Sequence, residues 1–219
     1  MPAKANTKKI TKDAIIGAYM DYVLEHEVVP KSIYKFCKAN KIKEDEFYQF
    51  FGSVEGLQKE IWNTFFNNTE ALLNKNEDFA SFSNKDKMLT FFFTFFELLT
   101  LNRSYVLFTL NENNNMLKNM EQLKGLRHHI KGFATDLIEE GNANKPSKLT
   151  QHPPKIFSEG AWLQFLFLLK FWRDDSSPAF EKTDLAIEKS VTTIFDLFDN
   201  TPLENILDFG KFLYKENFS

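Results

Sequence analysis

The segment that most constrains the fold of this chain is residues 32–62. A first set of apolar residues recurs there at the spacing of one helix face: Ile33, Phe36 and Cys37. A second set follows the turn residue Ile42: Phe47, Tyr48, Phe50 and Phe51. Another helical pattern begins at Ser53. This spacing predicts two short helices joined by a turn, with a longer helix directly after them.

The pattern resembles the N-terminal part of the TetR family of one-component transcriptional regulators, over residues 10–62. Residues 47–51 are similar to the family's recognition-helix core, and residues 53–57 are similar to the start of its fourth helix. Four residues match the packing positions of its first helix: Ile10, Ala14, Ile15 and Ala18. The resemblance implies an all-α fold. It has a small three-helix helix-turn-helix domain over residues 1–52 and a larger helical ligand-binding and dimerisation domain over 53–219, with residues 53–75 as the connecting helix.

The same resemblance implies contacts with DNA. The residues expected to approach the duplex are Lys31, Lys43, Tyr48 and Gln49. Three residues nearer the N-terminus are expected to contact backbone phosphates: Lys8, Lys9 and Lys12. In a dimer, two such recognition helices must be about 34 Å apart to enter successive major grooves.

The acidic residues of this segment argue against binding to DNA. Glu44, Asp45 and Glu46 fill the first turn of the expected recognition helix, and Val54 stands where the family usually carries a lysine. Residues 1–62 contain ten lysines, nine acids and no arginine, so the segment is nearly neutral. Carboxylates repel phosphates, although they also stabilise a helix N-terminus. A lipid-binding or scaffold protein that kept this fold without binding DNA is therefore the alternative.

Phenylalanine is unusually frequent, with 25 among 219 residues. Many of them gather in two segments, 91–96 and 162–172. Helices that are apolar nearly all round are expected to be buried, and their rings either fill a core or line a cavity for an apolar small molecule or lipid. The cavity-lining candidates are Phe92, Phe95, Phe96, Trp162, Phe165 and Phe167. Polar residues such as Glu97 and Arg103 interrupt the first segment, so we do not expect it to span a membrane.

The C-terminal part carries a second, fainter resemblance. Residues 171–183 are similar to a segment of the TetR-fold lipid-binding accessory proteins of ubiquinone biosynthesis. The last expected helix, 203–216, has one apolar stripe: Leu203, Ile206, Leu207, Gly210 and Leu213. Such a helix could lie on a bilayer surface, dock on its own domain or dock on a second subunit.

Several helix boundaries can be predicted from capping and turn residues. Ser83 with Asp86 predicts a helix start, a second helix is expected over 117–140, and Ser177 before Pro178 predicts another start. Residues 141–154 read as a polar loop. The adjacent Asp174 and Asp175 are interpreted as turn and capping residues.

No catalytic, metal or cofactor site is expected. The four histidines lack ligand spacing, and the chain contains no GxSxG, P-loop or GxGxxG motif. The single cysteine, Cys37, is expected to pack on the buried face of its helix. With no apolar leader segment and a net charge of −3, a cytoplasmic location is expected. We therefore expect a ligand-responsive, dimeric, DNA-binding regulator that is not an enzyme.

Overall fold

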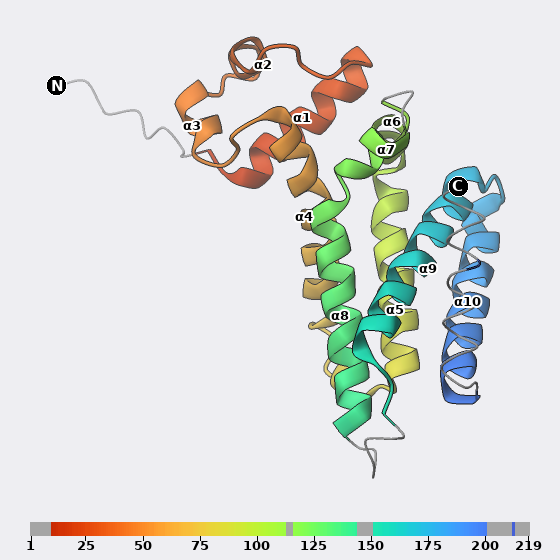
Figure 1. Ribbon diagram of the computed structural model, residues 1–219. Coiled ribbons are helices and arrows are strands. Elements are labelled where there is room, and N and C mark those ends of the chain that lie inside the picture. The colour runs from red at the N-terminus through yellow and green to blue at the C-terminus, as the bar shows by residue number, and fades with distance from the viewer. Residues whose placement is uncertain (1–9, 113–115, 144–150, 201–211, 213–219) are drawn as a thin grey trace. The chain divides into compact units, whose positions relative to one another are not determined.

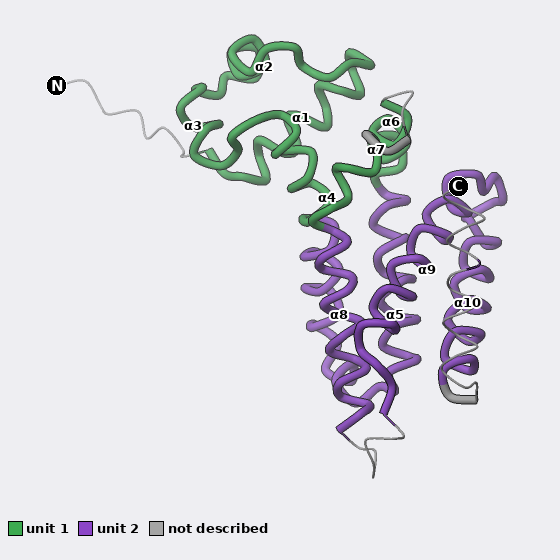
Figure 2. Tube along the Cα trace, viewed as in Figure 1, with its two compact units in different colours: residues 1–64, 102–125 green, residues 65–101, 126–219 purple. Residues whose placement is uncertain are grey.

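The computed structural model describes residues 10–112, 116–143, 151–200 and 212 (Figure 1). Every regular element among these residues is a helix, which confirms the all-α prediction. The chain divides into two compact units (Figure 2). Unit 1 comprises residues 1–64 and 102–125, and unit 2 comprises residues 65–101 and 126–219. Among the described helices, none is both long and apolar enough to cross a membrane.

Unit 1 begins with three helices, α1 (Lys12–His26), α2 (Ile33–Ala39) and α3 (Glu44–Tyr48). It also contains the first half of α4 (Val54–Leu73), together with α6 (Arg103–Leu110) and α7 (Met116–Glu121). The hydroxyl oxygens of Thr11 and Ser32 cap α1 and α2 by accepting backbone N–H bonds at 3.2 and 3.3 Å. Such caps satisfy amides that the first helical turn leaves without partners.

The turn between α2 and α3 follows the predicted pattern. Lys41 adopts a left-handed backbone with φ 56°, and the amide of Ile42 then donates to the Cys37 carbonyl at 2.9 Å. Phe36 and Phe47 lie edge to face at 6.3 Å beneath this turn, and both are buried. Cys37 is also buried, as expected for a packing residue. Helix α3 ends at Tyr48, so only the first part of the 47–51 segment is helical.

Unit 2 contains the second half of α4, the short 3₁₀ helix η1 (Phe79–Ser81), α5 (Asn84–Leu101) and α8 (Lys124–Ala143) from residue 126. It continues through α9 (Pro154–Asp174), the 3₁₀ helix η3 (Pro178–Phe180) and α10 (Glu181–Asn200). Helix α10 packs against α5 and α9. The core of unit 2 contains many of the phenylalanines that are so frequent in the sequence.

Polar contacts fix the ends of these helices. The amide of Asp86 donates to Ser83 Oγ at 3.2 Å, which confirms the predicted start of α5. In the same turn, the buried Lys87 donates to both carboxylate oxygens of Glu140 at 2.8 Å. Asn84 Nδ2 donates to the Leu137 carbonyl at 2.6 Å. These bonds hold the first turn of α5 to the last turns of α8.

Three expected helices differ from the structure or lie outside it. The helix predicted over 117–140 is two helices, because α7 ends at Glu121 and α8 begins at Lys124. The helix start predicted at Ser177 is first a 3₁₀ turn, and α10 follows from Glu181. Apart from Phe212, the expected helix over 203–216 lies outside the described residues.

Candidate functional site

The α2–α3 pair of unit 1 carries most of the residues expected to contact DNA. Lys31, Lys43, Tyr48 and Gln49 are all exposed, and the Tyr48 side chain is 50% accessible. Buried Phe47 supports Tyr48 from below, with its ring edge-on at 5.6 Å. These side chains therefore lie at the surface, with the exposed ring of Phe50 nearby in sequence, over a buried aromatic core. The structure leaves them accessible to a partner.

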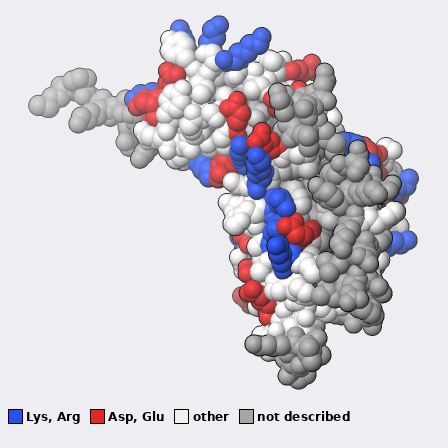
Figure 3. Space-filling model, in the orientation of Figure 1, with Lys and Arg blue, Asp and Glu red and all other residues white. Residues whose placement is uncertain are grey.

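The N-terminal lysines are placed only in part. Lys8 and Lys9 lie outside the described residues. Lys12 forms an ion pair with Glu60, which joins the start of α1 to α4. A contact with a phosphate by Lys12 would have to compete with this partner. In the view of Figure 3, cationic and acidic side chains alternate over unit 1 without forming a continuous basic surface.

The acidic first turn of α3 has a local role for one of its three members. Glu46 accepts a hydrogen bond from the amide of Lys43, the residue that precedes the helix, at 3.2 Å. This bond satisfies the backbone donor of the residue that precedes the helix. Glu44 is half-buried and Asp45 is exposed, so their charges remain next to Tyr48 and Gln49. The capping role thus explains Glu46 alone.

A buried polar network joins α6 to α1 and α4 within unit 1. Gln58 Nε2 donates to the Tyr19 hydroxyl at 3.0 Å and to the Glu112 carboxylate at 2.8 Å. Burial raises the pKa of Glu112, Gln58 opposes that shift by its hydrogen bond, and Glu55 adds to it by repulsion. Burial also raises the pKa of Tyr19 and of Tyr105, whose hydroxyl is enclosed and whose ring lies 6.3 Å from that of Tyr19.

A second bond network holds α6 and α7 in place. Trp62 Nε1 donates to Gln122 Oε1 at 2.9 Å, and Gln122 Nε2 donates in turn to the Thr109 carbonyl at 3.0 Å. Gln122 is buried in the break between α7 and α8. Neither network was predicted, because its members are up to 60 residues apart in sequence and share no motif.

Five of the six aromatic residues proposed to line a cavity meet in the core of unit 2. Phe92, Phe95, Phe96, Trp162 and Phe165 are each at most 7% exposed. Phe165 contacts Phe95 edge to face at 5.6 Å and stacks on Trp162 at 5.3 Å. Phe167 is separate from this cluster, since it is 53% exposed and pairs with Phe171 at 6.2 Å.

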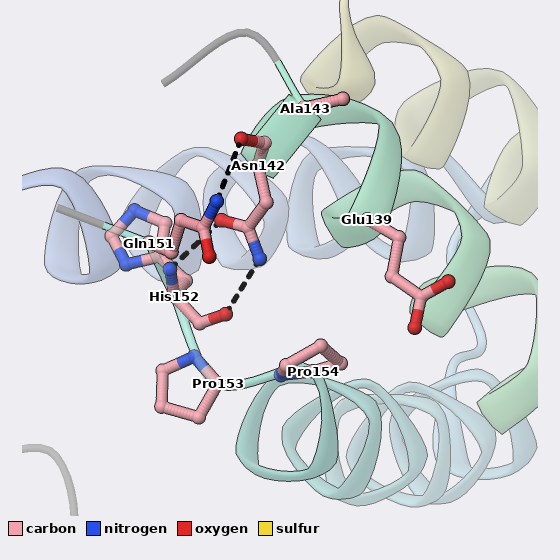
Figure 4. A pocket seen from close by; sticks show the side chains of 7 residues that line it. All are labelled: Glu139, Asn142, Ala143, Gln151, His152, Pro153 and Pro154. Carbon is pink, nitrogen blue, oxygen red and sulfur yellow. Dashed lines mark hydrogen bonds between the residues drawn. The ribbon is translucent and has the colours of Figure 1, made fainter. Parts of the chain in front are cut away.

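A pocket of about 520 Å³ lies elsewhere in unit 2, between the end of α8 and the start of α9 (Figure 4). Asn142 spans its wall, because its side chain accepts from the His152 amide at 2.8 Å and donates to the His152 carbonyl at 2.7 Å. Glu139, Ala143, Gln151 and two prolines complete the lining that Figure 4 shows. The side-chain amide of Asn142 is therefore already engaged in hydrogen bonds to the His152 backbone.

Of the two aspartates interpreted as turn and capping residues, Asp175 is a cap, whereas Asp174 is the last residue of α9. Asp175 accepts hydrogen bonds from the amides and the hydroxyls of Ser177 and Thr183, at 2.7 to 3.0 Å. Burial raises the pKa of Asp175, but these four bonds outweigh burial and lower it to about 2. Asp174 forms an ion pair with Arg173. The described residues contain no cluster of His, Cys, Asp or Glu suited to a metal ion.

Comparison with known protein families gives a match in the C-terminal part of the chain. Residues 87–213 match the family described as tetracyclin repressor-like, C-terminal domain. The matched segment begins in α5, includes α8, α9 and α10, and covers more than half of the chain. Residues 1–86, with the α2–α3 pair, lie outside the match. No curated protein matches the chain.

Proposed function

Because the chain belongs to the family of tetracyclin repressor-like C-terminal domains, we propose that it is a ligand-responsive transcriptional regulator. In this proposal it is cytoplasmic, binds DNA as a homodimer through the α2–α3 pair and binds an apolar small molecule in its C-terminal domain. It acts by binding rather than by catalysis. The observation that carries the proposal is the exposed α2–α3 pair in a chain whose larger part belongs to this regulator family.

The exposed residues of the pair have chemistry suited to DNA. The Gln49 amide can donate and accept at a base edge, as in the paired bonds that glutamine makes with adenine. Lys31 and Lys43 supply charge for phosphates, and Tyr48 supplies a hydroxyl donor. Helix α3 is short, so positioning depends on the buried Phe36–Phe47 contact beneath it.

The ligand role is assigned to the aromatic core of unit 2. Phe92, Phe95, Phe96, Trp162 and Phe165 already pack against one another or against neighbouring rings. Phe167 would take part only at the outer face of α9. An apolar ligand would therefore have to part these rings, and its binding would favour a different helix arrangement. A ligand that prefers one arrangement changes DNA affinity by the same factor by which DNA changes ligand affinity.

The test is binding of the purified protein to fragments of its own upstream region across a salt series. The expected result is selective binding whose affinity falls steeply with salt. Gln49→Ala should cost about 1–3 kcal/mol on the selected fragment alone, whereas Lys43→Ala should weaken all fragments and lower the salt slope by about one. Lys75→Ala, an exposed lysine beyond α4, is the matched charge control. Equal affinity for all fragments in every variant would refute the proposal.

A second candidate is a lipid-binding or scaffold protein that does not read DNA. The exposed Asp45 and the half-buried Glu44, which lie beside the residues expected to contact DNA, favour this candidate. The lack of arginine in residues 1–62 also favours it. Asp45→Asn separates the two candidates. It should strengthen DNA binding if this face meets phosphates, while Glu77→Gln, an exposed acid elsewhere, should not. No binding by either variant at low salt, with a copurified lipid seen by native mass spectrometry, would establish the second candidate.

A further inference from the structure

Unit 1 has no continuous basic surface, but α2 carries a local row of cations on its outer side. Residues 28–43 contain five lysines and no acid. Three of these lysines and one tyrosine are exposed and form what we call the lysine arc: Tyr34, Lys35, Lys38 and Lys41. The four residues are distinct from those that the regulator proposal assigns to DNA contact.

The buried side of α2 determines which of its residues face outwards. Phe36 and Cys37 are at most 2% exposed. At about 100° per residue, Tyr34, Lys35 and Lys38 lie within about 100° of one another on the opposite side of the helix. The Tyr34 side chain is 56% accessible. The lysine arc is therefore directed away from the core of unit 1.

The charges of the lysine arc are not neutralised within the part of the chain that the structure describes. No ion pair among the described residues involves Lys35, Lys38 or Lys41. Lys38 Nζ instead lies 5.9 Å from the centre of the Tyr34 ring, a contact that holds the ammonium group without cancelling its charge. Figure 3 shows cationic side chains over α2, at the top of the view. The nearest acids in sequence flank the segment: Glu27 and Glu44.

The chemistry of the lysine arc fits a polyanion with closely spaced charges. Lysine binds a phosphate as a point charge, and the arc has no arginine for a bidentate contact with guanine. The seven residues of α2 are about 10 Å long, and a DNA duplex presents about six phosphates over that length, at one per ~1.7 Å. A bilayer surface would require apolar side chains beside the cations, whereas Phe36 and Cys37 of α2 are buried.

We propose that the lysine arc is a sequence-independent binding surface for the phosphate backbone of duplex DNA. Lys35 and Lys38 contact phosphates from α2, and Lys41 does so from the turn that follows. Tyr34 positions the Lys38 ammonium group and can donate its hydroxyl to a phosphate oxygen. The arc then supplies an attraction that the acidic first turn of α3 opposes. This activity goes beyond the proposed regulator, because it does not require the residues of α3 to read bases.

Binding of the full chain to a random-sequence duplex across a potassium chloride series tests the surface. Lys35→Gln, Lys38→Gln removes two phosphate contacts, so the plot of log affinity against log salt should become less steep by about 1.8. At 0.1 M salt the same change corresponds to about 60-fold weaker binding. Lys35→Arg, Lys38→Arg keeps both charges and should keep the slope. Lys75→Gln, Lys182→Gln removes the same charge from exposed positions of unit 2 and should also leave the slope unchanged.

Circular dichroism confirms that each variant is folded. An unchanged slope in the Lys35→Gln, Lys38→Gln chain would overturn the proposal, as would a wild-type chain that does not bind the random duplex at low salt. Binding to vesicles of phosphatidylserine and phosphatidylcholine that is lost in this variant, without binding to the duplex, would assign the arc to a membrane and overturn the proposal too.

The same measurements separate the lysine arc from the proposed regulator. If the wild-type chain binds random and upstream fragments equally and the double glutamine variant loses slope, the arc is supported and the regulator is refuted. If the upstream fragment is selected and the slope does not change in that variant, the arc alone is refuted.

Discussion

Gly125 is the position where a single methyl group should be most damaging. It is the second residue of α8, and a Cβ built on it would lie 2.3 Å from Asn63 Oδ1, 3.0 Å from Asn63 Nδ2 and 3.1 Å from Asn63 Cγ. Asn63 lies on α4, and its Nδ2 donates to the Glu60 carboxylate at 3.0 Å. The amide therefore cannot turn aside without losing that bond. Gly125→Ala must move Asn63 or separate α8 from α4.

The expected magnitude follows from two opposing effects. Overpacking of a well-filled contact costs about 1–3 kcal/mol, and alanine regains up to about 1 kcal/mol of helix propensity. Gly125→Ala should therefore lower the free energy of unfolding by about 1–2 kcal/mol. Gly132 on the same helix is the matched control, because a Cβ there would meet nothing within 4 Å. Gly132→Ala should instead raise the free energy of unfolding by about 0.5–1 kcal/mol.

Urea unfolding followed by far-ultraviolet circular dichroism measures both variants. The double variant Asn63→Ala, Gly125→Ala removes the obstacle and should regain most of the loss. Because these two residues are in contact, their effects should not add. If Gly125→Ala is as stable as Gly132→Ala, or if the double variant regains nothing, then the close approach of α8 to Asn63 is not what constrains this position.

Three further variants test the charged contacts, again by urea unfolding. Glu140→Ala leaves the buried Lys87 ammonium without its carboxylate and should cost about 1–3 kcal/mol; an unchanged midpoint would contradict the pairing. Asp175→Asn should be less stable than wild type above about pH 4, and this difference should narrow towards pH 2, because the folded pKa of Asp175 lies below the unfolded value. If the difference in stability between the two chains did not change with pH, the ionised carboxylate of Asp175 would not be what stabilises this turn. The pKa of Glu112 is raised, so Glu112→Gln should be the more stable chain at neutral pH and lose that advantage in acid; an advantage that grows in acid would refute this.

Local chemistry accounts for what could be predicted about the fold. Ser83 with Asp86 correctly marked the start of α5, because a cap depends on residues three positions apart. Asp175 was correctly interpreted as a cap for the same reason. The break at Gln122 was missed, because its side chain bonds to Trp62 and to the Thr109 carbonyl, and no local pattern shows such distant partners. The network at Gln58 was missed for the same reason.

The candidate site was predictable to a similar extent. Exposure of Lys43 and Gln49 follows from the period that buries Phe47, whereas Tyr48, which the spacing placed in the apolar set, is also exposed. The ion pair of Lys12 with Glu60 could not be predicted, since it joins residues 48 positions apart. Whether the face binds DNA depends on the net effect of Asp45 and the lysines on phosphate, and neither spacing nor burial determines that balance.

The two aromatic residues of α9 that the structure separates show why composition alone could not define the cavity. Phe165 and Phe167 are two positions apart, about 200° around a helix, so they cannot face the same core. Phe165 is fully buried, whereas Phe167 is 53% exposed. Helical periodicity therefore places these two rings on different sides of α9. The core of unit 2 covers the first. Phe167 therefore does not belong to the residues that an apolar ligand in the core could touch.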